Sequence, residues 1–126
     1  MSGLQTYLPI VGRILLSIIF LVSGFGKITG TEFYVGYMEA FGVPGILIWP
    51  TIVLEIVGGV LLVVGYQTRW AAAALAAFTL VSALIFHTNF ADQNEMVNFM
   101  KNLAITGGFL YVIAYGAGAF SVDNRK

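Results

Sequence analysis

Four long apolar segments constrain this chain more than any other feature of its sequence. They lie at about residues 8–28, 46–66, 70–88 and 98–119, and each has the roughly 20 residues that a helix needs to cross a bilayer. Backbone polar groups in lipid must be satisfied within helices or closed barrels, and these segments are too continuous for alternating barrel strands. The 126 residues are 59% hydrophobic and 10% charged, too few polar groups for a soluble domain. We therefore expect an all-α transmembrane four-helix bundle that forms a single domain over residues 1–126.

A short additional helix is predicted between the first two spans. Thr31 is a suitable N-cap for it, and Pro44 prevents the helix from continuing. Aromatic side chains recur in this segment at four-residue spacing, at Phe33, Tyr37 and Phe41. Because aromatic rings are favoured at the membrane–water boundary, we expect a short interfacial amphipathic helix, with an ordered loop as the alternative.

Basic residues predict the orientation of the chain in the membrane. With four spans, both termini and the turn near residue 67 share one side, which collects Arg13, Arg69, Arg125 and Lys126. The positive-inside rule places that side, and both termini, in the cytoplasm of a multi-pass protein of the plasma (inner) membrane. Arg13 interrupts the first apolar segment and no basic region precedes it, so we expect that span to be retained rather than cleaved.

Several kinds of chemistry do not fit the residue inventory. The sequence has no cysteine and one histidine, so thiol relay, cysteine-ligated clusters and bis-histidine haem are excluded within one chain, and no metal site is expected. No glycine-rich phosphate loop is present, and the formal net charge of zero argues against a nucleic-acid partner. If the protein takes part in electron transfer, the electrons must come from a partner protein or a lipid-soluble carrier.

Glu55 is the only charged residue in the apolar run 49–65. It lies ten residues after Gly45, about 15 Å along a helix and near the middle of the bilayer. A carboxylate at that depth costs free energy unless it is protonated or paired, so it marks a candidate functional site, with a structural hydrogen bond as the alternative. Arg13 or Lys101 is a candidate partner. The adjacent pair Gly58-Gly59 leaves room for either close helix packing or a flat ligand.

The first span carries its polar residues along one stripe. Arg13, Ser17 and Lys27 follow helical spacing, so this face should turn toward the bundle interior. Arg13 and Lys27 are 14 residues apart, about 21 Å along a helix. The alternative is that both side chains extend to opposite membrane surfaces and have no further role.

Polar residues at the outer ends of the third and fourth spans complete a predicted pocket. His87 ends the third span, and Lys101 and Asn102 open the fourth. Together with Lys27, and with Glu55 beneath them, they should line an outward-facing polar pocket roofed by the aromatic helix. Glu55 and His87 are the candidates for handling protons, although a histidine at a helix end is more often simply solvated.

The sequence resembles the DoxX family of small four-helix membrane proteins over nearly its whole length. The resemblance rests on Gly12-Arg13-Ile14-Leu15-Leu16, Phe20-Leu21-Val22-Ser23-Gly24 and Gly26-Lys27, on the run 55–72 that opens with Glu55-Ile56-Val57-Gly58-Gly59, on Phe86-His87, on Lys101-Asn102-Leu103-Ala104-Ile105-Thr106-Gly107-Gly108, and on Phe120-Ser121-Val122-Asp123. The family takes its name from a thiosulfate:quinone oxidoreductase, and some members are described as membrane partners of redox enzymes. The resemblance implies the four-helix fold and a quinone-linked redox role. The family-like polar positions are Arg13, Lys27, Glu55, Arg69, His87, Lys101 and Asn102.

Three functions follow from these observations. The first is a membrane subunit of a quinone-linked oxidoreductase system that binds a quinone or other small hydrophobic ligand near Glu55. Its candidate ligand contacts are Arg13, Lys27, Glu55, His87, Lys101 and Asn102, and its partners would be membrane lipid with a redox protein or a second copy of the chain. The second is a non-enzymatic assembly subunit whose polar interior only fixes helix packing. The third is a small transporter, although four helices are few for a transport path. Whether the chain is itself an enzyme stays open at this point.

Overall fold

The computed structural model describes residues 2–89, 91–119 and 121–124, and all regular secondary structure in these ranges is helical. The elements in order are α1 (Ser2–Thr29), α2 (Thr31–Ala40), the 3-10 turn η1 (Gly45–Leu47), α3 (Ile48–Val64), α4 (Thr68–Phe86) and α5 (Gln93–Tyr115). In the described part of the chain, α1, α4, α5 and the continuous segment of η1 with α3 are long and apolar enough to cross a membrane. The prediction of an all-α bundle with four spans and a short helix between the first two is confirmed.

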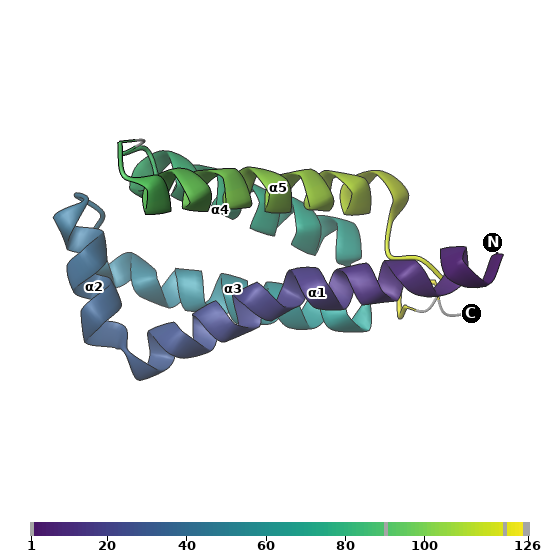
Figure 1. The fold of residues 1–126 in the computed structure, drawn as a ribbon. Helices are drawn as coiled ribbons and strands as arrows, with labels where there is room; N and C mark the ends of the chain where they lie inside the picture. Colours follow the sequence, from purple (N-terminus) through teal and green to yellow (C-terminus); the bar gives the residue numbers. More distant parts are fainter. Residues whose placement is uncertain (1, 90, 120, 125–126) are drawn as a thin grey trace.

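The four long helices form two layers. Helices α1 and α3 pack side by side in one layer, and α4 and α5 pack in the other (Figure 1). Between the layers lies an apolar core in which Leu62, Leu75 and Phe109 are fully buried. The rings of Phe20 from α1 and Phe109 from α5 meet with centroids 5.6 Å apart. This core holds the layers together along the middle of the bundle, while the layers diverge toward α2 (Figure 1).

Helix α2 crosses the diverging end of the bundle. It follows α1 after a single residue, Gly30, and its buried Met38 packs with Ile48 and Ile52 of α3. Thr31 was expected to cap this helix, but Gly30 occupies the cap position, and the Thr31 hydroxyl donates to the Lys27 carbonyl oxygen at 2.7 Å. The predicted N-cap is therefore wrong, because the hydroxyl bonds back to the preceding helix instead of to its own.

Three aromatic rings join α2 to α4. The ring of Phe86, the last residue of α4, stacks on Tyr37 with centroids 5.3 Å apart and meets Phe41 at 5.1 Å. Tyr37 and Phe41 also contact each other, at 5.0 Å. Since such pairs contribute about 0.5–1.5 kcal/mol each beyond their burial, this cluster is the main attachment of α2 to the second layer.

The opposite end of the bundle is closed by the segment 121–124. The turn between α3 and α4 begins at Gly65, whose φ of +73° is the left-handed conformation that glycine adopts without strain. Asp123 accepts hydrogen bonds from the backbone N–H groups of Gln67 and Thr68, at 2.8 and 2.9 Å, and so caps α4 from a distant part of the chain. Burial raises the pKa of Asp123, but the adjacent Thr68 side chain, these two backbone donors and the charge of Arg13 lower it by more.

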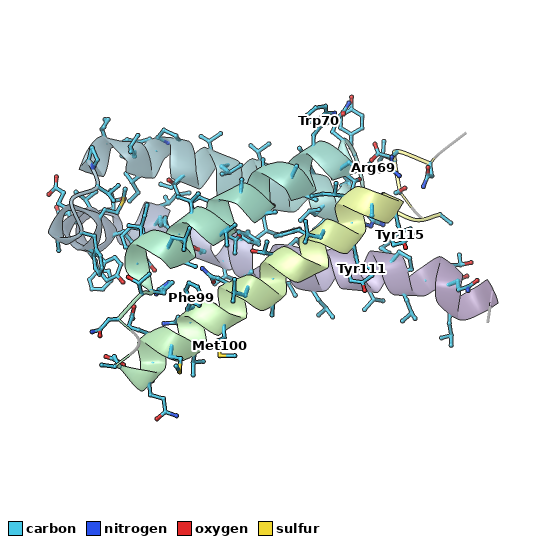
Figure 2. All side chains as sticks on the ribbon, turned by 90° about the horizontal axis from the view of Figure 1, so that it is seen from above. Arg69, Trp70, Phe99, Met100, Tyr111 and Tyr115 are labelled. Atoms are coloured by element: carbon cyan, nitrogen blue, oxygen red, sulfur yellow. The ribbon has the colours of Figure 1, made fainter. Side chains whose placement is uncertain are left out.

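Exposed aromatic residues mark this same end (Figure 2). Trp70 is 77% exposed and Tyr115 is 79% exposed, and the Tyr115 ring stacks on Tyr111 with centroids 6.2 Å apart. Figure 2 shows all three at the same end of the bundle as Arg69, away from Phe99 and Met100. Tryptophan, tyrosine and arginine prefer the boundary between lipid and water, so this end of the bundle is suited to anchoring there.

Candidate functional site

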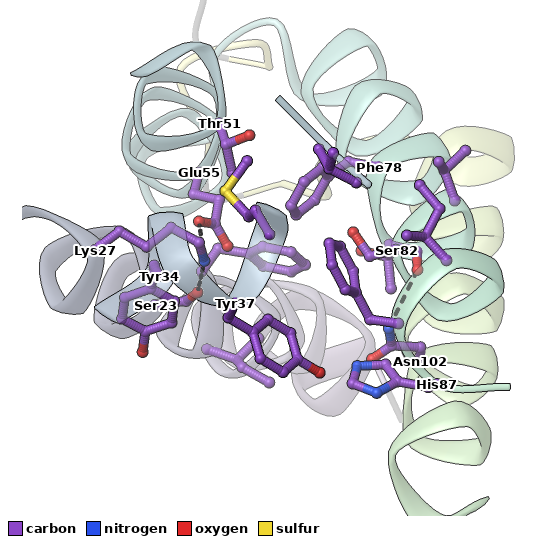
Figure 3. A pocket seen from close by; sticks show the side chains of 18 of the residues that line it. Ser23, Lys27, Tyr34, Tyr37, Thr51, Glu55, Phe78, Ser82, His87 and Asn102 are labelled. Carbon is purple, nitrogen blue, oxygen red and sulfur yellow. Dashed lines mark hydrogen bonds and ion pairs between the residues drawn. The ribbon is translucent and has the colours of Figure 1, made fainter. Parts of the chain in front are cut away.

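A cavity of about 370 Å³ lies between the two layers beneath α2. Its size is within the range of about 300–1,000 Å³ that is usual for small-molecule sites. Residues from α1, α2, α3, α4 and α5 line it, and most of its wall is apolar. Polar side chains interrupt this wall, and among them Figure 3 labels Ser23, Lys27, Thr51, Glu55, Ser82, His87 and Asn102.

The centre of the site is an ion pair between α1 and α3. Lys27 Nζ lies 2.9 Å from Glu55 Oε1, and the two side chains are only 14% and 3% exposed. Lys27 also donates to Ser23 Oγ at 2.7 Å, one turn earlier on α1, and its ammonium lies 5.1 Å from the centroid of the Tyr34 ring. Each charge thus meets an opposite charge or a polar partner at a depth where an isolated charge would be strongly disfavoured.

The partner of Glu55 differs from the two that the sequence suggested. Arg13 and Lys101 were the candidates, but the carboxylate pairs with Lys27. The way α1 packs against α3 explains why Lys27 is the partner. The close approach of α1 to α3 at Gly24, where a Cβ would lie 2.7 Å from Ile56 Cδ1, brings the next turn of α1 against Glu55. Among the described residues, Lys101 has no carboxylate within ion-pair distance, and its side chain is exposed at the rim of the cavity.

A second polar pair lies at the α4–α5 side of the cavity. His87 follows the last residue of α4, and its Nδ1 lies 3.0 Å from Glu95 Oε2 in the first turn of α5. The phenol of Tyr37 in α2 points toward His87 (Figure 3). Burial, together with the negative charge of Glu95, raises the pKa of Tyr37. His87 is therefore partnered, and it connects the loop after α4 to the cavity wall.

Asn102 fastens α5 to α4 inside the cavity. It is 8% exposed, and its Nδ2 donates to the Thr79 carbonyl oxygen at 3.2 Å. The Thr79 hydroxyl in turn donates to the Leu75 carbonyl oxygen at 2.6 Å. This arrangement holds one amide group of the site at a fixed position relative to both helices.

Arg13 lies apart from this group. It is 2% exposed and is not among the residues that line the cavity. Its Nη1 donates to the carbonyl oxygens of Leu62 and Val63, at 2.9 and 3.3 Å, where the C-terminal end of α3 has carbonyls without helical partners. The inclusion of Arg13 among the pocket contacts is therefore corrected, because about 21 Å of helix separates it from Lys27. Arg69, another family-like position, is also outside the cavity, and its Nη2 lies 3.5 Å from the Ala114 carbonyl oxygen.

The paired glycines of α3 serve helix packing. A Cβ at Gly59 would lie 2.7 Å from Leu21 Cδ2 of α1, and one at Gly58 would lie 3.0 Å from Leu75 Cδ1 of α4. Neither glycine lines the cavity. Of the two uses that the sequence left open, close helix contact is the one the structure shows, and it places α3 against both neighbouring spans.

Five cavity residues therefore meet as the sequence analysis expected, and several others were missed. The predicted set of Lys27, Glu55, His87, Lys101 and Asn102 lines one cavity. The candidate site residues did not include Ser23, Tyr34, Tyr37, Thr79 or Glu95, although Tyr37 belongs to the aromatic helix that was expected to roof the pocket. Ser23 could have been found from its four-residue spacing to Lys27, whereas the contact between His87 and Glu95 depends on how an irregular loop folds.

The residue types present limit what the cavity could hold. In the described part of the chain no group of three His, Cys, Asp or Glu side chains could bind a metal ion. An ammonium donor, an amide and an imidazole face an apolar space, which suits a flat, largely apolar molecule with hydrogen-bond acceptors at its edge.

Comparison with known proteins identifies the family. A family model described as DoxX matches residues 8–88. The chain belongs to the DoxX family. It is 46% identical to the inner membrane protein YqjF of Escherichia coli K12, an alignment that covers 100% of the chain and 99% of YqjF. It is 36% identical to the inner membrane protein YphA of the same strain, over 94% of the chain and 89% of YphA.

A more distant relative carries an enzymatic name. CatD of Bacillus subtilis strain 168, a candidate oxidoreductase by name, is 34% identical over 73 residues, which cover 58% of the chain and 54% of CatD. No solved structure matches the chain. With four helices that can cross a membrane and relatives named as inner membrane proteins, this DoxX-family chain is a multi-pass integral membrane protein.

Proposed function

We propose that this DoxX-family protein is a membrane subunit of a quinone-linked oxidoreductase system in the plasma membrane and that its cavity binds a quinone head group. The observation that carries the proposal is the Lys27–Glu55 ion pair in the wall of a mostly apolar cavity between two helix layers. An ionisable pair within membrane spans is costly to maintain and is typical of a functional site.

The chemistry of a quinone fits the groups that line the cavity. A quinone carbonyl oxygen accepts hydrogen bonds, and the Lys27 ammonium is a donor next to the apolar space. The quinol form carries two hydroxyl donors, and the Glu55 carboxylate is an acceptor beside the same space. The site can therefore provide one partner for each redox state without rearranging its helices.

Reduction of a quinone to a quinol takes up two electrons and two protons. Glu55 and His87 are the groups placed to supply or receive the protons. The electrons come from outside the chain, because the sequence has no cysteine and only one histidine for a redox centre. The proposal thus requires a redox partner, and the enzymatic name of CatD supports a role of this class.

The direct test is whether the purified protein binds a quinone. We expect organic extraction of detergent-purified protein to release a quinone at a substantial fraction of one per chain, and an added short-chain quinone to raise the thermal unfolding temperature. Glu55→Gln should weaken both effects. Glu32→Gln, at an exposed position of α2 that does not line the cavity, is the matched control and should change binding by less than about twofold. Protein that retains no quinone and shows no thermal shift with any added quinone would contradict the proposal.

One observation favours a second function, that of an assembly subunit without catalysis. Polar groups of the cavity already have partners within the protein. Glu55 pairs with Lys27, His87 contacts Glu95, and Asn102 donates a hydrogen bond to the Thr79 carbonyl oxygen. Such a network could serve only to fix the positions of the helices. In that case Glu55→Gln would lower the recovery of a stoichiometric partner in native pull-down experiments, and no variant would differ in quinone binding.

The orientation in the membrane belongs to the same proposal. We place both termini and the α3–α4 turn in the cytoplasm and α2 on the outer side, as the basic residues favour. The absence of native cysteines allows a clean test by single-cysteine labelling. Phe33→Cys, at an exposed position of α2, should react with a membrane-impermeant maleimide in intact cells, whereas Asn124→Cys should react only after lysis. The reverse pattern would invert the topology.

A further inference from the structure

A groove on the lipid-facing side of α1 adjoins the cavity. It is lined by successive turns of α1, including Leu15, Val22 and Gly26, and by Tyr34 of α2. Leu15 and Val22 are 64% and 66% exposed. Three residues, Ile19, Ser23 and Tyr34, line both the groove and the cavity. The two spaces are therefore separated only by the side chains at the junction of α1 and α2.

Tyr34 forms the partition between the two spaces. Its ring lies under the Lys27 ammonium, with 5.1 Å between Nζ and the ring centroid. Its hydroxyl reaches the groove, where it would lie 3.5 Å from a Cβ at Gly26. Figure 3 shows the ring beside Ser23, with the hydroxyl turned away from Glu55. A single side chain thus contacts the ion pair at one end and the groove at the other.

The character of the wall changes across this partition. On the cavity side lie the ammonium of Lys27 and the carboxylate of Glu55. On the groove side lie mainly aliphatic side chains, with Ser23 and Tyr34 at the partition and no charged residue in the lining. This is the arrangement expected for an amphiphile that has a polar head and a hydrocarbon tail. From residue 15 to residue 26 the groove runs about 16 Å along α1.

We infer that the ligand of the cavity is a tailed amphiphile whose hydrocarbon chain passes Tyr34 and Ser23 and lies in the groove along α1. This inference rests on the proposed function, because the head group it assumes is the quinone ring. It adds the class of ligand, a lipid-soluble quinone rather than a small soluble one, and the route by which that ligand enters from the bilayer.

The test compares one quinone ring with and without a tail. The probes are 2,3-dimethoxy-5-methyl-1,4-benzoquinone and the same ring carrying a ten-carbon chain, with binding measured in nanodiscs. The groove is obstructed by Val22→Trp. The matched control is Val57→Trp, on an exposed face of α3 that lines neither space. Because each affinity is compared between variants for the same probe, partition of the probe into lipid cancels.

We expect Val22→Trp to weaken binding of the tailed probe by at least about fivefold, equivalent to ~1 kcal/mol. Binding of the ring without a tail should change by less than about twofold, and Val57→Trp should change neither. If Val22→Trp weakens binding of both probes equally, or of neither, the tail does not lie in the groove, while the proposal of a quinone site in the cavity is not contradicted. If neither probe binds the unmodified protein, the proposed function fails and the tail route fails with it.

Discussion

The ion pair between Lys27 and Glu55 predicts a large coupling energy in a double-mutant cycle. Its two atoms lie 2.9 Å apart, so Coulomb attraction at an effective dielectric constant of about 20 amounts to ~6 kcal/mol. Desolvation of both charges offsets several kcal/mol of this attraction. We therefore expect a net coupling of about 2–4 kcal/mol between Lys27→Met and Glu55→Gln.

The two single substitutions should lower the free energy of unfolding by different amounts. Glu55→Gln leaves the Lys27 ammonium in place, with Ser23 Oγ at 2.7 Å and the Tyr34 ring as its remaining partners. These partners place the expected loss near 3 kcal/mol, at the lower end of the range of about 3–5 kcal/mol for breaking a buried pair. Lys27→Met should cost more, because it leaves the Glu55 carboxylate, whose side chain is 3% exposed, without the ammonium that donates to it.

The assay is reversible unfolding in mixed micelles with increasing dodecyl sulfate, and a second cycle with Lys101→Met is the control. Lys101 is exposed and has no carboxylate within ion-pair distance in the described part of the chain. Its coupling to Glu55 should stay below about 0.5 kcal/mol. A coupling between Lys27 and Glu55 as small as that of the control, or a larger coupling to Lys101, would refute the assigned pairing.

Three other substitutions test separate parts of the structure. Asp123→Ala should lower the free energy of unfolding by about 1 kcal/mol at neutral pH, because it removes the cap of α4. Since the folded-state pKa of Asp123 is lowered, the extra stability of the unmodified protein should be complete above the ordinary pKa of 3.8 and should disappear as the pH falls below that value. Thermal unfolding measured across pH tests this. Gly65→Ala should lower the free energy of unfolding by at least ~2 kcal/mol, because the residue has a φ of +73° and an added Cβ would collide with neighbouring side chains. Gly107→Ala is the control: no described atom lies within 4 Å of its added carbon, so this substitution should be neutral or stabilising by up to ~1 kcal/mol. Phe86→Ala removes the ring contacts with Tyr37 and Phe41 that attach α2 to α4, so amide hydrogen exchange in α2 should become faster while exchange in the middle of α4 stays unchanged. Equal acceleration in both helices would contradict this attachment.

The fold could be predicted from the sequence because lipid restricts the alternatives. Four apolar segments of about 20 residues have few solutions other than spanning helices. The boundaries were less predictable. Helix α5 begins at Gln93, whereas the fourth apolar segment was placed at about residues 98–119. Asp92 accepts a hydrogen bond from Asn94 N at 2.9 Å and starts the helix within the polar loop. Hydropathy indicates where a helix meets lipid, but capping decides where it begins.

The site was predictable at the level of which residues gather and less so at the level of which residues pair. Glu55, His87 and Asn102 line one cavity because their positions along the spans place all three in the half of the bundle next to α2. The partner of Glu55 depends on the rotation of α1 about its axis. That rotation follows from close contacts at Gly24 and Gly59, whose partners a single sequence does not reveal. The capping of α4 by Asp123 is a contact between residues more than fifty positions apart, and no local pattern indicates it.

The proposed ligand of the cavity beside the Lys27–Glu55 pair is a flat molecule with a carbonyl group. The most direct test is a density map of the protein in nanodiscs, recorded with and without an added tailed quinone. We expect a ring between the two helix layers, with one carbonyl oxygen within hydrogen-bond distance of Lys27 Nζ, and density for the tail leaving past Tyr34. A cavity that stays empty or filled by side chains under saturating quinone, or a quinone bound elsewhere on the protein, would contradict it.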